Sequence, residues 1–207
     1  MPFGADIEKV KAAFGCKNET LFTEVQETHL FTYYDEELSF KRELYDIIFN
    51  YIPKIERVST TSKFFGLIKG NDGRGLKGNW PDYGYALLCI CDLMGKHLCT
   101  EYHSLFYNAS WDKLNTLMAN ANSSFDLRRI IKSSYIFDTP FKKEEITCNY
   151  YDKNEVHALL KDILKIEFPA AKEGEEVLKL YIILKEGLEY CSKNNHDLIF
   201  FSIEAAD

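Results

Sequence analysis

Apolar residues near the start of the chain recur every three or four positions, which is the spacing of one helical face. Ile7, Val10 and Phe14 lie on such a face. Asp6 is a favourable N-cap for this helix, and Gly15 stands where a left-handed residue would end it. We therefore predict a short helix between Asp6 and Gly15.

Two further helices are predicted in the first part of the chain. One begins near Asn18 and places Phe22 and Val25 on its apolar face. The other is expected over residues 35–51 and to end before Pro53, because proline breaks helices. Its apolar face is formed by residues at helical spacing, namely Leu44, Ile47, Ile48, Tyr51 and Ile52.

The middle of the chain is expected to contribute two more helices. The apolar residues 83–94 predict a buried helix, with Asp82 as its N-cap and Gly95 as its end. A second helix is predicted over residues 111–121, with Ser110 as its N-cap.

The last part of the chain predicts two amphipathic helices and two strands. Residues 146–151 alternate like a strand, and the apolar run 197–203 is short enough for a buried strand. A further short strand is expected near residues 98–102. Apolar residues at helical spacing predict helices over residues 156–164 and 175–192.

These elements predict a single α+β domain over residues 1–207, mostly helical, with a small sheet that includes the C-terminal strand. The composition, 46% hydrophobic and 28% charged, is typical of a folded protein of this length. Charges interrupt the first residues, and no apolar run reaches the roughly 18 residues of a membrane span. We therefore expect a cytoplasmic protein without a membrane partner.

Charge is unevenly distributed along the chain. The 25 basic and 32 acidic residues give a net charge of -7, so no broad positive field exists to attract nucleic acid. Residues 1–50 hold 5 basic and 10 acidic side chains, residues 51–100 hold 7 and 4, and residues 151–207 hold 7 and 12. Acidity therefore lies at the two ends, around a mildly basic middle.

A glycine-rich segment precedes the helix predicted over residues 83–94. Backbone N–H groups of Gly70–Gly78, together with Arg74 and Lys77, could hold an anion, but the spacing matches neither a P-loop nor a dinucleotide fingerprint. A surface loop is the favoured interpretation. The nearby Trp80 either fills the core or anchors a partner. The candidate partner-binding residues are Arg74, Lys77, Trp80, Asp82 and Tyr83.

Cysteines and histidines suggest a metal site only weakly. Cys91, His97, Cys99 and His103 could converge, yet they lack the Cys-x2-Cys spacing of zinc sites. The six cysteines are better explained as free thiols buried in a reducing compartment. We therefore expect no metal, no cofactor and no catalytic residue among them.

Several short segments together resemble a known group of proteins. They are residues 5–15, Tyr83–Leu87, the helix start at Glu155, and residues 195–201. In these segments the chain resembles small bacterial cytoplasmic proteins of unknown function and is more distantly similar to the YfbM-like proteins. The resemblance implies a compact, helix-rich α+β fold, and it implies no active-site residues.

We predict a non-enzymatic role in binding another protein. The acidic ends and the 13 Tyr and 15 Phe residues favour such a role, because acidic surfaces speed association with basic partners and aromatic rings anchor interfaces. An immunity or antitoxin-like protein that neutralises a partner toxin fits this description. The alternative is a small enzyme or a nucleotide- or phosphate-binding protein that uses Gly70–Gly78.

Overall fold

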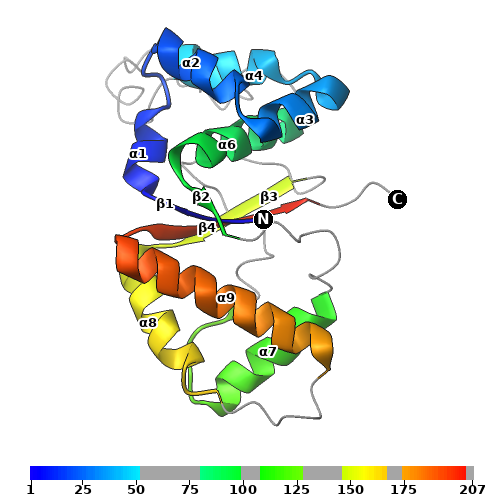
Figure 1. Cartoon of the computed structure of the whole chain (residues 1–207), viewed down its shortest axis with the longest axis vertical. Helices are drawn as coiled ribbons and strands as arrows, with labels where there is room; N and C mark the ends of the chain where they lie inside the picture. Colours follow the sequence, from blue (N-terminus) through cyan, green and yellow to red (C-terminus); the bar gives the residue numbers. More distant parts are fainter. Residues whose placement is uncertain (52–79, 99–107, 128–145, 167–173, 204–207) are drawn as a thin grey trace, which may run out of the picture.

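The computed structural model describes residues 1–51, 80–98, 108–127, 146–166 and 174–203. Within these residues, a four-stranded antiparallel sheet lies between two layers of helices (Figure 1). The strand order is β2-β1-β4-β3. The strands are β1 (Pro2–Ala5), β2 (Lys96–His97), β3 (Ile146–Tyr151) and β4 (Asp197–Ile203).

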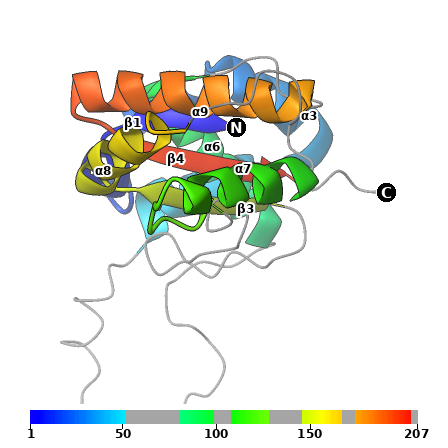
Figure 2. The same cartoon turned by 90° about the horizontal axis from the view of Figure 1, so that it is seen from below.

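The upper layer in Figure 1 covers one face of the sheet. It contains α1 (Ile7–Ala12), α2 (Glu19–Gln26), α3 (His29–Leu38), α4 (Lys41–Tyr45), the π-helix η1 (Asp46–Asn50) and α6 (Trp80–Met94). The lower layer, seen from below in Figure 2, contains α7 (Asn108–Asn120), α8 (Lys153–Ile163) and α9 (Glu175–Asn194).

The described chain is thus mostly helical, with a small sheet that includes the C-terminal strand, which confirms the predicted α+β class. None of the helices in the described part of the chain is long and apolar enough to cross a membrane.

Strand β4 contributes side chains to the hydrophobic cores on both faces of the sheet. Ile199 and Phe201 join the upper hydrophobic core, whereas Leu198 and Phe200 join the lower one. A strand that is buried on both faces reads as a nearly continuous hydrophobic run, as residues 198–201 of β4 do. That run predicted β4 correctly.

Strand β1 was not predicted, although it lies between β2 and β4. It is only four residues long and contains Pro2 and Gly4, which both disfavour strands. Phe3 nevertheless pairs with Ile199 on one side and with His97 on the other. Tertiary pairing, rather than local preference, therefore makes this segment a strand.

The prediction of one helix over residues 35–51 is wrong. Helix α3 already begins at His29, and Ser39, at φ 55, ends it in the left-handed conformation. The Asp35 carboxylate then accepts a hydrogen bond from Lys41 N at 3.0 Å, at the start of α4. This turn buries Phe40 completely, so core packing accounts for the break.

Helix starts were predicted with mixed success. Asp6 caps α1 by accepting a hydrogen bond from Glu8 N, as predicted. Asp82 and Ser110 are not N-caps, because α6 and α7 begin earlier, at Trp80 and Asn108. Strand β2 likewise lies just before the predicted residues 98–102, of which 99–102 are outside the described residues.

Two glycines let helices approach the sheet closely. A Cβ on Gly84 would lie 2.2 Å from Ile146 Cγ2, so α6 can cross β3 only without a side chain at this position. On the other face, a Cβ on Gly4 would lie 2.8 Å from Tyr190 Cδ1 of α9. Close packing of both layers therefore depends on these positions.

We expect Gly84→Ala to destabilise the protein by about 1–3 kcal/mol, because the new methyl group overpacks the contact with the buried Ile146. Urea unfolding measures this loss. Gly187→Ala, also inside a helix, is the matched control. Its Cβ would lie 3.3 Å from the movable Leu98 Cδ1, so we expect no loss of stability. Equal unfolding midpoints for the two variants would contradict the assigned role of Gly84.

Candidate partner-binding surface

Four of the five predicted partner-binding residues have no described side chain. Arg74 and Lys77 lie outside the described residues, as does the whole segment Gly70–Gly78. Trp80 and Asp82 belong to the first turn of α6, where only the backbone is described. Their part in partner binding, and the alternative of a phosphate-binding segment, therefore remain predictions.

The side chain of Tyr83, the fifth residue, lies in the upper core and is only 1% exposed. Its hydroxyl donates a hydrogen bond to Asp46 Oδ2 at 3.1 Å, and Asn50 Nδ2 donates one to Asp46 Oδ1 at 2.6 Å. Buried carboxylates require such donors, because losing water is costly. Tyr83 therefore fastens α6 to η1 and, contrary to expectation, offers no surface to a partner.

The cysteines of α6 and the nearby His97 behave as core residues. Burial raises the pKa of the Cys89 and Cys91 thiols, so both stay protonated and are poor nucleophiles at neutral pH. His97 stacks on Phe3, and burial, aided by the N-terminal ammonium group, lowers the pKa of His97 to about 4. Among the residues that the structure describes, no three potential ligands are grouped for a metal, and Cys99 and His103 lie outside them.

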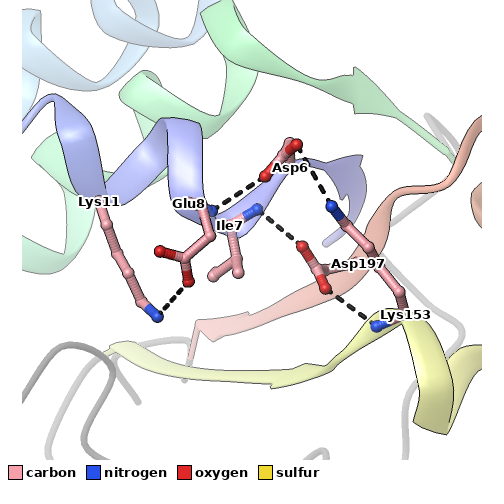
Figure 3. Close-up of polar contacts among 6 residues, drawn as sticks. All are labelled: Asp6, Ile7, Glu8, Lys11, Lys153 and Asp197. Carbon is pink, nitrogen blue, oxygen red and sulfur yellow. Dashed lines mark hydrogen bonds and ion pairs between the residues drawn. The ribbon is translucent and has the colours of Figure 1, made fainter.

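A buried polar network joins the starts of α1, α8 and β4 (Figure 3). The Asp197 carboxylate accepts hydrogen bonds from Ile7 N at 2.7 Å, through Oδ2, and from Lys153 N at 3.0 Å, through Oδ1. Asp197 is 2% exposed. The Lys153 side chain returns to Asp6, where Nζ and Oδ2 form an ion pair at 3.3 Å.

The two carboxylates of this network titrate in opposite directions. Burial raises the pKa of Asp197, although the hydrogen bond from Ile7 N and the charge of Lys153 oppose this effect. Burial acts in the same direction on Asp6, but the hydrogen bonds from Lys153 and from Glu8 N outweigh it, so the pKa of Asp6 is lowered. Because both groups hold helix starts, we assign this network to the fold.

The exposed side of α2 forms an acidic face, made of Glu19, Glu24 and Glu27. These glutamates belong to a longer stretch, residues 18–40, that contains six acidic residues and no Lys or Arg. In Figure 1, α2 lies at the outer edge of the upper layer, away from the sheet. Three of the ten acidic residues in the first fifty are thus presented to solvent along one helix.

An aromatic cluster, made of Phe22, Tyr45 and Phe49, lies beside this acidic face. Tyr45 stacks on Phe49 with ring centroids 4.4 Å apart, and Phe22 meets both rings edge-on at 5.6 and 5.8 Å. Tyr45 is 45% exposed, so almost half of its side chain is open to solvent while the ring is stacked. Rigid aromatic rings that are held ready at a surface are typical anchors of protein interfaces.

The sequence predicted an acidic and aromatic surface but did not identify the residues that form it. The aromatic surplus and the acidic ends were both noted, yet Phe22 was assigned to the apolar face of its helix and Tyr45 was not singled out. The run of residues 18–40 without a single Lys or Arg is the signal that could have located the acidic face, whereas Tyr45 and Phe49 lie beyond that run.

No family model, no curated protein and no solved structure matches this chain. The resemblance to small bacterial cytoplasmic proteins therefore stays a prediction. The α+β class that it implied agrees with the structure, but a fold class does not identify a function.

We expect Tyr83→Phe to reduce stability by about 1–3 kcal/mol, because the buried Asp46 carboxylate would lose a hydrogen-bond donor. Chemical unfolding measures this change. Tyr33→Phe is the matched control, since Tyr33 is 52% exposed and its hydroxyl can bond to water. Unchanged stability in Tyr83→Phe would show that Asp46 does not depend on this hydroxyl.

Proposed function

We propose that this chain is a non-enzymatic protein-binding protein that docks the acidic face of α2 and the neighbouring aromatic cluster onto a basic surface of another protein. The observation that carries the proposal is the half-exposed, stacked Tyr45 ring beside a helix face of glutamates. An immunity or antitoxin-like role, in which the chain masks a basic surface or active site of a toxin, fits this combination.

The aromatic cluster would supply most of the affinity. Its rings are held by one another, so little conformational entropy is lost when a partner covers them. Phe22 and Phe49 are already partly buried, which leaves Tyr45 as the ring with the most area still to bury. We therefore expect Tyr45 to dominate the interface.

The acidic face would supply speed and selectivity. Glutamates at the edge of an interface attract a basic partner over about a Debye length and repel acidic proteins. The glutamates of α2 suit this task, because no Lys or Arg lies among them in residues 18–40. A bacterial cytoplasmic location would place the protein where an intracellular toxin has to be neutralised, and it remains part of the proposal.

We expect Tyr45→Ala to weaken partner binding by about 30-fold, which corresponds to about 2 kcal/mol for the loss of an anchoring ring. The partner would be captured from lysate of the native cell, identified by mass spectrometry and purified for titration calorimetry. Leu178→Ala, at an apolar residue of α9 that is similarly exposed, is the control and should bind normally. Equal affinities for both variants would reject the aromatic cluster as the anchor.

We expect the triple change of Glu19, Glu24 and Glu27 to Gln to slow association with the same partner about tenfold at low salt. High salt should remove the difference, because screening abolishes long-range attraction. The matched control is a triple change to Gln on α9, at Glu175, Glu186 and Glu189. Stopped-flow mixing measures the association rates. An equal slowing in both triple variants would show that net charge, and not the acidic face of α2, controls the rate.

A further inference from the structure

Helices α1 and α8 begin in the same way, although they lie on opposite sides of the sheet (Figure 1). In each, an aspartate N-cap accepts the hydrogen bond of the second helical amide: Asp6 from Glu8 N at 3.1 Å, and Asp152 from Asn154 N at 2.8 Å. The first amide of each helix is left over, and both of these amides bind the carboxylate of Asp197. One side chain thus holds the starts of two helices.

This double contact is strongest with an ionised carboxylate, because charge-assisted hydrogen bonds are stronger than neutral ones. Each Asp197 oxygen faces one N–H donor, Oδ2 facing Ile7 N and Oδ1 facing Lys153 N. A protonated carboxyl group keeps some acceptor capacity, but one of its oxygens becomes an O–H donor and a weaker acceptor. Protonation therefore weakens the hydrogen bond to one of the two helix starts.

The start of α8 is the one that can be released more easily. Its hydrogen bond to Asp197 is the longer of the two, at 3.0 Å against 2.7 Å. It also has a complete capping box of its own, in which Asp152 accepts from Glu155 N and Glu155 Oε2 accepts from Asp152 N. We propose that Asp197 is an acid-sensitive latch between the two helical layers, which opens by giving up Lys153 N while it keeps Ile7 N.

Charged and titratable groups reach this latch from three neighbouring helices. They are Asp6 and Lys11 at α1, Lys153 at α8, and Cys191 on α9. The negative charge of Asp6 favours a proton on Asp197, whereas Lys153 opposes it. Burial, together with the charge of Asp197, raises the pKa of Cys191 to about 12, so this thiol stays neutral while the latch titrates.

The direction of the titration favours local opening over unfolding. Burial raises the pKa of Asp197 in the folded protein, so the folded state binds this proton more tightly than the unfolded chain does. The stability linked to this group is fully present below the unfolded value of 3.8 and is lost as pH rises through the folded pKa. The proton that Asp197 takes up on acidification therefore opens the latch without itself unfolding the chain.

Amide NMR of the whole protein over a pH series tests the latch. We expect the amide proton shifts of Ile7 and Lys153 to follow one common midpoint above 3.8. Below that midpoint, the hydrogen-exchange protection factor of Lys153 N should fall at least tenfold, while that of Ile7 N and the far-UV circular dichroism stay unchanged. Asp197→Asn should abolish the shared titration.

Asp162→Asn is the matched control, because Asp162 also accepts side-chain hydrogen bonds, from Ser123 and Lys165, but touches neither Ile7 nor Lys153. This variant should titrate like the wild type. Separate midpoints for the two amides, preferential loss of protection at Ile7, or a titration that survives in Asp197→Asn would each overturn the proposal. The wild-type series decides the question even if Asp197→Asn does not fold.

Discussion

The arrangement of the two helical layers depends on the hydrogen bonds that the Asp197 carboxylate accepts from Ile7 N and Lys153 N. This carboxylate stands at the first residue of β4, and its two oxygens receive the first amides of α1 above the sheet and of α8 below it. A charge that is this deeply buried is tolerated only where hydrogen bonds replace water, and removing its donors would leave it uncompensated. The position of β4 in the sheet and the directions of the two helices are therefore set together.

Much of this fold could be predicted from the sequence, because local sequence patterns indicate several of its helices and strands. The alternation of β3, the hydrophobic run of β4, the apolar stripe of α8 and the N-cap Asp6 are properties of neighbouring residues. Strand β1 and the break at Ser39 depend instead on distant partners. Phe3 needs Ile199 and His97 for its pairing, and Phe40 needs a core to enter.

The candidate surface shows the same division. Composition and charge pointed toward a protein partner, because both are sums over residues that can be counted without a structure. Such sums do not tell whether a particular side chain points into the core or toward solvent. Tyr83 belongs to a helix that is buried almost all round, so no apolar stripe showed whether its ring faces the core or a partner. Tyr45 and Phe49 lie across the junction of an α-helix and a π-helix, where the 3.6-residue period no longer tells which side chains share a face.

The pairing of β1 with β4 has a consequence for how the protein is made. Met1 and Phe201 exchange backbone hydrogen bonds across 200 positions of sequence, so the centre of the sheet joins two strands that are far apart in the chain. During synthesis, β1 must wait for β4 before the two can pair, while the local contacts of α2 with α3 can already form. During that wait the apolar side chains of β1 lack the residues of β4 that cover them in the core, so the nascent chain is open to aggregation until β4 emerges.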